Sequence, residues 1–209
     1  MKMILWINGA FGSGKTTTAF ELRLRIKNIK SIVYDPENVG YFLWKNSSDI
    51  LKKGDFQDYE LWREINYKTL KLISENFDGI IIVPMTLVNP EYYKEIVGKL
   101  TDNGINLKHF ILYADKETLL KRLSKRELRT VRTLRKGKGD SFAVNSIDRC
   151  IYSFDNYITE EKIIVGKKSV DDIVEEIAKK SNIELKADKR WKIKKFFDRN
   201  FTILKHIRK

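Results

Sequence analysis

The amino-acid sequence predicts an α/β fold in which a five-stranded parallel sheet lies between layers of helices. Five short segments rich in apolar and β-branched residues have the length of strands, and segments with helical periodicity separate them. Strands that alternate with helices are typical of a doubly wound parallel sheet. The five expected strands are residues 3–7, 31–34, 79–83, 107–113 and 162–165.

A glycine-rich phosphate-binding loop (P-loop) follows the first expected strand. Residues 9–16 read G-A-F-G-S-G-K-T and fill every fixed position of the pattern G-x-x-x-x-G-K-[ST], with a helical segment, 17–26, after them. Glycines allow backbone N–H groups to curl around phosphate oxygens, and the helix N-terminus adds a positive dipole end. An ordinary Gly/Ser-rich turn is the alternative, which both flanking segments disfavour. The sequence therefore predicts a three-layer P-loop NTPase fold.

This loop indicates ATP and Mg²⁺ as cofactors. We expect Lys15 to reach the β- and γ-phosphates and Thr16 to place its hydroxyl on the metal ion. The residues expected to bind the nucleotide are Gly9, Gly12, Ser13, Gly14, Lys15, Thr16, Thr17 and, from a later helix, Arg149.

Composition limits the class of protein. The chain has 209 residues, 42% of them hydrophobic, which suits one domain with a sizeable core. The single cysteine, Cys150, allows no intramolecular disulfide, and no apolar stretch approaches the roughly 18 residues of a membrane-spanning helix. We therefore expect a cytoplasmic protein.

The net charge of +13 comes from two basic segments on a mildly acidic body. Residues 121–138 carry nine Lys or Arg against one acidic residue, and residues 186–209 carry ten against two. We expect residues 1–185 to form a kinase-like domain, with an acceptor-binding helical lobe at 40–76 and a basic lid at 121–145. Residues 186–209 are expected to form a basic amphipathic C-terminal helix.

An acidic residue follows the second expected strand. In open α/β sheets, ligands bind outside the carboxyl ends of the strands, so Asp35 lies at the functional edge. Asp35 is a candidate for the catalytic base, for substrate binding and for the carboxylate on the Mg²⁺ side. The sequence Asp-Pro also suits a helix N-cap with proline at the first helical position, and the two roles are compatible.

The aromatic lobe and the third strand supply candidates for acceptor binding. Most rings in residues 40–76 are expected to form the core of the lobe, while Trp62 is a candidate for stacking on a substrate and Arg63 for holding a polar or anionic group. The third strand ends in Pro-Met-Thr, so Thr86 is a further candidate. No acidic Mg²⁺ partner follows that strand, which weakens a motor-type or GTPase-type hypothesis and leaves that role to Asp35 or Asp115.

Basic residues after the fourth strand predict a phosphate-covering lid. Arg122 and Arg126 are four residues apart and share a helix face, so both are candidates for stabilising the transferred phosphoryl group. Gly137 and Gly139 have the character of hinges, and Arg149 is a candidate at the lid base. A solvated, charged helix is the alternative.

The tail from 188 to 207 projects as an amphipathic helix. Its apolar residues fall in one arc: Ile193, Phe196, Phe197, Phe201, Ile203, Leu204 and Ile207. Docking on the protein's own core, on a partner helix or on a membrane surface all remain open, and we favour the first slightly.

Eight segments together resemble the tunicamycin-resistance protein family of P-loop proteins. The resemblance rests on W-I-N-G-A-F-G-S-G-K-T-T (6–17), V-Y-D-P-E (33–37), D-F-Q (55–57), L-W-R (61–63), I-V-P-M-T (82–86), P-E-Y (90–92), K-E-T-L-L-K-R-L (116–123) and I-D-R-C (147–150). It implies an ATP-binding protein with a nucleoside/nucleotide-kinase-like fold that protects against a nucleoside antibiotic by phosphorylating it, with a C-terminus that touches the membrane. Residues 135–139 depart from the family pattern.

Three functional hypotheses follow. The first is an ATP-dependent small-molecule kinase in which Asp35 accepts the proton of an acceptor hydroxyl, Lys15, Thr16 and Mg²⁺ hold the phosphates, and the lid arginines stabilise the transition state. The second is a protein that sequesters an amphiphilic antibiotic and uses ATP to set its conformation. The third, a nucleic-acid-associated P-loop protein, rests on charge alone and ranks last.

Overall fold

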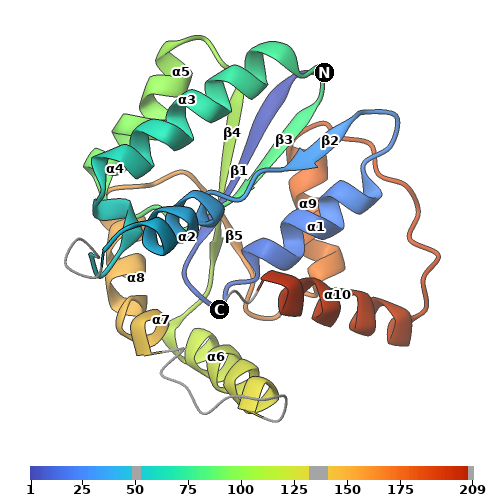
Figure 1. Ribbon diagram of the computed structural model, residues 1–209. Helices are drawn as coiled ribbons and strands as arrows, with labels where there is room; N and C mark the ends of the chain where they lie inside the picture. Colours follow the sequence, from blue (N-terminus) through green and yellow to red (C-terminus); the bar gives the residue numbers. More distant parts are fainter. Residues whose placement is uncertain (49–52, 132–140, 207–209) are drawn as a thin grey trace.

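The computed structural model describes residues 1–48, 53–131 and 141–206, and the side chains among these except 126–131, 141 and 202–206. Figure 1 shows a central sheet with helices on both sides. Among the described residues, no helix combines the length and the apolar character that crossing a membrane requires.

The sheet contains five parallel strands in the order β2-β3-β1-β4-β5. Their bounds are β1 Met3–Gly9, β2 Ser31–Val33, β3 Ile80–Pro84, β4 Leu107–Tyr113 and β5 Glu161–Ile164. Each lies within two residues of the bounds expected from the sequence. The central strands β1 and β3 are buried along their whole length, and strands buried on both faces have continuous apolar sequences. The predicted five-stranded parallel sheet is confirmed.

Alternate residues of β1 enter two separate cores, which makes the fold three-layered. Met3, Leu5 and Ile7 pack with α1 (Lys15–Arg25), α6 (Lys116–Val131), α8 (Ile147–Asn156) and α9 (Val170–Lys180). Ile4 and Trp6 pack on the other face with α3 (Glu60–Asn76) and with the helical segment α4 (Pro90–Tyr93), η3 (Lys94–Gly98) and α5 (Lys99–Asp102). Side chains alternate across a strand, so one apolar strand feeds both layers.

Three helical predictions differ from the structure in detail. The helix expected at 90–100 is a continuous segment that contains a π-helical turn at Lys94–Gly98. The helix expected at 145–157 begins two residues later, as α8, and a separate short helix, α7 (Ser141–Asn145), precedes it. The first helix starts at Lys15, two residues earlier than expected, because Gly14 adopts a left-handed conformation that ends the P-loop.

The lobe at 40–76 consists of α2 (Glu37–Asn46), the short 3-10 helix η2 (Phe56–Asp58) and α3. A Cβ on Gly40 would lie 2.4 Å from the ring of Phe56, so α2 packs closely on η2. Trp62 is fully buried, and its indole N–H donates to the carbonyl oxygen of Pro36 at 3.1 Å. The prediction that Trp62 stacks on a substrate is therefore wrong, since its ring belongs to the core of the lobe and its polar atom holds the turn after Asp35.

The C-terminal helix α10 (Lys192–His206) lies against α1 on one side of the sheet (Figure 1). Its polar face makes this contact. The guanidinium of Arg190 lies 2.5 Å from Glu21, 2.8 Å from Asp188 and 3.1 Å from Asp198, and Arg199 lies 2.6 Å from Asp171. A carboxylate as buried as Glu21 requires a cation, which the tail supplies.

The apolar residues of α10 are largely exposed, with Phe196 on the flank next to α1 and α9. Four of its residues are more than half exposed: Ile193, Phe196, Phe197 and Phe201. The side chains of Ile203, Leu204 and Ile207 lie outside the described residues. The tail thus docks on the protein itself, which is the alternative that we slightly favoured. It does so through its basic face and not through its apolar face, because the acidic side chains of α1 and α9 attract the basic face.

Candidate functional site

The P-loop connects β1 to α1 with three glycines at positive φ. These are Gly9 at 146°, Gly12 at 82° and Gly14 at 102°. A Cβ on Gly9 would lie 2.6 Å from the Ser13 hydroxyl oxygen and 2.7 Å from the carbonyl oxygen of Leu112. Both the dihedral angle and the close approach require glycine, so the loop keeps the tight curvature that turns backbone N–H groups toward an anion.

The ammonium group of Lys15 is buried within this loop. It donates to the carbonyl oxygen of Gly9 at 2.9 Å and to that of Ala10 at 3.1 Å. These carbonyls are neutral, and a buried cation is stabilised best by negative charge. The loop curvature and this ammonium fit the phosphates of a nucleotide.

Arg122 joins the P-loop to two other elements. From α6, its guanidinium donates to the carbonyl oxygen of Ser13 at 3.3 Å and to that of Val165, directly after β5, at 2.7 Å. Partial burial lowers the pKa of Arg122, but the side chain remains a cation at neutral pH. Of the two expected lid arginines, Arg122 therefore lies beside the loop. The side chain of Arg126 and residues 132–140, with both expected glycine hinges, lie outside the described residues.

A chain of hydrogen bonds connects the lobe to the P-loop. The hydroxyl of the buried Thr86 donates to the carbonyl oxygen of Gly9 at 2.8 Å, so Thr86 and Lys15 share that acceptor. The side-chain amide of Gln57 donates to the carbonyl oxygen of Thr86 at 3.1 Å. Thr86 thus links Gly9 of the loop to Gln57 of the lobe.

Arg63 completes this chain. Its guanidinium donates to the carbonyl oxygen of Gln57 at 2.7 Å and to the carboxylate of Glu95 at 2.7 Å, and it lies over the ring of Tyr92. Its side chain is only 11% exposed. The prediction that Arg63 holds an acceptor group is therefore wrong for this structure, because these contacts commit the guanidinium to positioning Gln57.

Asn8 fixes the end of β1, and sequence reasoning missed it. Its side-chain oxygen accepts from the backbone N–H of Gly9 at 2.8 Å and of Leu87 at 3.0 Å, and its amide donates to the carbonyl oxygen of Leu87. The signal was a lone asparagine within an apolar strand, because a fully buried amide needs partners in the fold.

Asp35 is half-buried and lies two residues beyond β2. Its carboxylate accepts from the backbone N–H of Glu37 at 3.0 Å, but the N-cap of α2 is Pro36, so Asp35 lies one residue before the capping position that the sequence allowed. β3 lies between β2 and β1, so Asp35 is at the carboxyl edge of the sheet but two strands from the P-loop strand. Its roles as base, substrate ligand and metal ligand are taken up below as proposals.

A second carboxylate, Asp55, is paired with a lid-base arginine, and sequence reasoning did not select it. Asp55 caps η2 by accepting from the N–H of Gln57 at 3.0 Å, and a guanidinium nitrogen of Arg149 lies 3.5 Å from it. Burial raises the pKa of Asp55, and Arg149 acts in the opposite direction.

The thiol of Cys150, the residue after Arg149, is buried. Burial raises its pKa to about 11, and the charges of Lys15, Arg149 and Asp55 all act on it. The signal in the sequence was the pair of short segments D-F-Q and I-D-R-C, which the fold joins through the ion pair of Asp55 with Arg149.

The expected metal ligands are Thr16 and Asp35, and Thr16 is half-exposed at the start of α1. Asp115, the other carboxylate considered, caps α6: its oxygens accept from the N–H and the hydroxyl of Thr118 at 2.7 and 2.9 Å. Within the described part of the chain, the acidic group with metal-ligand spacing is Glu21, Asp171 and Asp188, which ion-pairs with the tail instead.

Comparison with known protein families decides the family. The model of the AAA domain matches residues 5–141, which is more than half of the chain and includes the P-loop, the lobe and α6. The chain belongs to the AAA domain family. No curated protein sequence matches this AAA-domain chain.

Solved structures share the fold of this AAA-domain chain. The tunicamycin resistance protein of Deinococcus radiodurans is 24% identical, with a TM-score of 0.69 over 89% of this chain and 99% of that chain. A sugar kinase from Janibacter sp. is 14% identical, with a TM-score of 0.58 over 88% of this chain and 96% of that one. The APS kinase of Mycobacterium tuberculosis in complex with AMPPNP and APS is 16% identical, with a TM-score of 0.54 over 87% and 98% of the two chains.

At these identities the similarity establishes the fold. The predicted P-loop kinase-like fold of the AAA-domain chain is confirmed, and so is its resemblance to tunicamycin-resistance proteins at the level of fold. The acceptor of any phosphoryl group is a separate question, which the geometry of the site addresses.

Proposed function

We propose that this protein is an ATP-dependent phosphotransferase that phosphorylates a hydroxyl of a nucleoside antibiotic such as tunicamycin. The observation that carries the proposal is the connection of the P-loop to the helical lobe through Thr86 and Gln57, together with the ion pair that joins Asp55 of the lobe to Arg149. A loop of this kind grips phosphates, and a lobe joined to it through Thr86 provides a place for an acceptor. The similarity to the tunicamycin resistance protein and to kinases supports the choice of acceptor and reaction.

In this proposal, residues of the P-loop hold the nucleotide, and three arginines surround the phosphoryl group that is transferred. Glycines 9, 12 and 14 shape the backbone of the P-loop, Lys15 contributes the cation, and the hydroxyl of Thr16 is the expected ligand of Mg²⁺. When bound, Mg²⁺ neutralises charge on the phosphates. The cations around the transferred group are Arg122, Arg126 and Arg149.

In the proposed reaction, the acceptor hydroxyl oxygen forms a bond to the γ-phosphorus while the bond from that phosphorus to the β–γ bridging oxygen breaks. The proton of the hydroxyl passes to a carboxylate, and ADP leaves with the electrons of the broken bond. Asp35, at the carboxyl edge of the sheet, is the proposed base. Asp55 is the alternative base, because burial already raises its pKa toward the range that suits proton transfer.

The experiment that tests this proposal looks directly for the phosphorylated product. Protein, ATP, Mg²⁺ and tunicamycin are incubated, and mass spectrometry is used to look for antibiotic that has gained one phosphoryl group. Asp35→Asn and Asp55→Asn are assayed in parallel. We expect turnover to fall about 10²-fold or more in the variant that lacks the base, with the Kd for ATP within about twofold of wild type. Unchanged turnover in Asp35→Asn would remove that residue from the mechanism.

Sequestration without chemistry is the second candidate. The end of β3 carries no acidic residue, and Thr86 there holds the loop and leaves the metal to other residues. A protein of this kind would bind tunicamycin more tightly with ATP than without it and would release it unchanged. Any phosphorylated product in the experiment above excludes pure sequestration.

Nucleic-acid binding is the third candidate, and the structure provides a reason to rank it last. Arg190, Lys195 and Arg199 of the basic tail are ion-paired with carboxylates of the same protein. A surface that binds phosphates presents its cations to solvent, and binding of that kind weakens steeply with salt. Affinity for DNA or RNA that falls steeply with salt concentration would reverse this ranking.

We also propose that the exposed face of α10 rests on an anionic membrane surface. Phe197 and Phe201 are 65% and 60% exposed, and an amphipathic helix with flanking lysines suits the interface of a bilayer. The double variant Phe197→Ser, Phe201→Ser should lose co-sedimentation with phosphatidylglycerol vesicles. Leu72→Ser, at an equally exposed position on α3, is the control and should behave as wild type. Wild-type protein that stays in the supernatant would refute this contact.

A further inference from the structure

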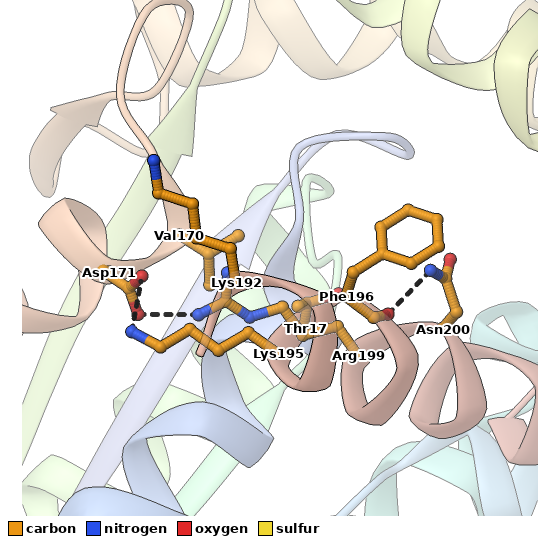
Figure 2. A pocket seen from close by; sticks show the side chains of 8 residues that line it. All are labelled: Thr17, Val170, Asp171, Lys192, Lys195, Phe196, Arg199 and Asn200. Carbon is orange, nitrogen blue, oxygen red and sulfur yellow. Dashed lines mark hydrogen bonds and ion pairs between the residues drawn. The ribbon is translucent and has the colours of Figure 1, made fainter. Parts of the chain in front are cut away.

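A cavity lies between the start of α1, the start of α9 and one flank of α10. Its volume is about 380 Å³, and Thr17, Val170, Phe196 and Asn200 are among the residues that line it (Figure 2). Thr17 follows directly on the P-loop residues Lys15 and Thr16. The cavity therefore adjoins the position at which the loop would grip phosphates.

Two observations indicate that a nucleotide whose phosphates lie in the P-loop would extend toward this cavity. Arg122 bonds both to Ser13 of the loop and to Val165 at the end of β5, so the chain that leads from β5 to Val170 runs beside the loop. Thr17, on the other side, lies in the first turn of α1. When the loop holds a triphosphate, the nucleoside lies outside the loop. The cavity is bounded by the segment from β5 to Val170 and by the first turn of α1, and it is open to that nucleoside.

The lining combines an aromatic ring and an amide with four charged side chains, those of Asp171, Lys192, Lys195 and Arg199. In Figure 2 the Phe196 ring and the Asn200 side chain lie together, apart from the ion pairs of Asp171. An aromatic ring offers a surface on which a base can stack, and a volume of a few hundred Å³ is typical of small-molecule sites. The ring of Phe196 is 52% exposed and so is accessible to a ligand.

The same ion pairs hold this wall in place. Lys195 lies 3.2 Å from Asp171, and Arg199 lies 2.6 Å from it. Lys195 and Arg199 lie on the turn of α10 that carries Phe196, so these contacts fix that turn. The aromatic wall is therefore in place before a ligand binds, which lowers the entropy lost on binding.

We propose that this cavity receives the nucleoside part of a nucleotide whose phosphates lie in the P-loop, with Phe196 of the C-terminal helix against the base. The inference rests on the proposed function, since it requires that the P-loop bind a nucleotide. It gives α10 a second role: its basic face docks the tail, its flank forms the base site, and its outer face remains exposed.

The test compares two ligands and two phenylalanines on the same helix. Calorimetry measures the Kd of ATP and of inorganic tripolyphosphate for wild type, Phe196→Ala, Phe196→Trp and Phe197→Ala. We expect Phe196→Ala to weaken ATP binding about 10-fold and to leave tripolyphosphate within about twofold, because only the base contact is lost. Phe196→Trp should retain the affinity for ATP. Phe197, which does not line the cavity, is the matched control, and Phe197→Ala should change neither ligand.

Three results would overturn the inference. ATP affinity in Phe196→Ala equal to or tighter than wild type would show that the ring does not support the base. An equal loss for tripolyphosphate would show a general effect on the P-loop. Wild-type protein that binds neither ligand would refute the proposed function and this inference with it, whereas wild-type binding without a Phe196 effect refutes the inference alone.

Discussion

The guanidinium of Arg149 lies 3.5 Å from the carboxylate of Asp55, and the two side chains differ sharply in exposure. Asp55 is 12% exposed and Arg149 is 56% exposed. A half-exposed arginine can turn toward another anion with little loss of packing, whereas the capping bond to Gln57 fixes Asp55. Arg149 is therefore the partner of this pair that can also engage an anionic ligand.

Removal of the Arg149 charge should raise the pKa of Asp55 further. Burial already raises that pKa, and Arg149→Ala deletes a cation that lowers it. We expect the acidic limb of the pH profile of kcat/KM to move to higher pH and kcat to fall about 10²-fold. Arg149→Lys keeps the positive charge and should shift the limb much less. An acidic limb that is identical in wild type and Arg149→Ala would show that Asp55 does not control the reaction.

Gly9 should tolerate no side chain. Its φ is 146°, and an added Cβ would meet the backbone oxygen of Leu112 at 2.7 Å, so Gly9→Ala should lower the free energy of unfolding by about 2 kcal/mol or more and abolish nucleotide binding. Gly104 has a φ of 74°, and a Cβ added there would meet no atom within 4 Å, which makes it the control for conformational strain alone. Gly104→Ala should cost about 1 kcal/mol. Urea unfolding measures both variants, and equal losses would contradict the steric argument.

Arg190 should hold the tail to the body of the protein. It bridges Glu21, Asp188 and Asp198, and Glu21 and Asp188 are almost completely buried. Arg190→Ala leaves both without this cation, so we expect a loss of about 3 kcal/mol and faster hydrogen exchange in residues 192–201. Lys194→Ala, at an exposed position of the same helix, should change neither quantity. Unchanged exchange in Arg190→Ala would show that other contacts dock α10.

The pH dependence of the docked tail follows from Asp188. Hydrogen bonds from Arg190 hold the pKa of Asp188 well below its ordinary value of 3.8. Because the folded-state pKa is depressed, this contribution to stability is complete above the ordinary carboxyl range and declines only as pH falls below it. Hydrogen exchange of residues 192–201 should therefore be constant between pH 5 and 8 after correction for its intrinsic rate.

His109 should make the protein less stable in mild acid. Its ring is buried in β4 beside Tyr93, whose hydroxyl donates to Glu160, and burial lowers the pKa of His109 to about 3 from an ordinary value of 6.5. Below pH 6.5 the unfolded chain binds a proton that the folded chain does not. Stability should therefore fall between pH 6.5 and about 3, by up to about 1.4 kcal/mol per pH unit. Urea unfolding at pH 7.5 and 5.5 measures this loss, and His109→Gln should reduce it.

The centre of the sheet could be predicted from the sequence because β1 and β3 are buried on both faces. Such strands appear as continuous apolar runs, and their bounds depend on the local chain. The three helical bounds that differed lie where contacts distant in sequence or unusual backbone geometry intervene, as in the π-helical turn at Lys94–Gly98.

Candidate site residues could be predicted only in part. Lys15 lies in a motif of consecutive residues, so its place in the loop followed from the pattern. We predicted that Trp62 and Arg63 contact the substrate because they are large side chains with polar ends in an aromatic lobe. The fold instead pairs Trp62 with Pro36 and Arg63 with Glu95, which are distant in the sequence. Asp55 was passed over for the opposite reason, since nothing near it in the sequence shows that it meets Arg149.

The sequence by itself determined the P-loop and the parallel sheet, because both follow from short-range rules: glycines that permit positive φ, and apolar runs too short for helices. Only the tertiary structure decided which face of the C-terminal helix docks. A helical projection shows that the helix has two faces, but the choice depends on Glu21, Asp171 and Asp188, whose carboxylates meet only in the folded chain. Electrostatic pairing of those buried charges outweighs the burial of phenylalanine rings, and it leaves the rings exposed to solvent.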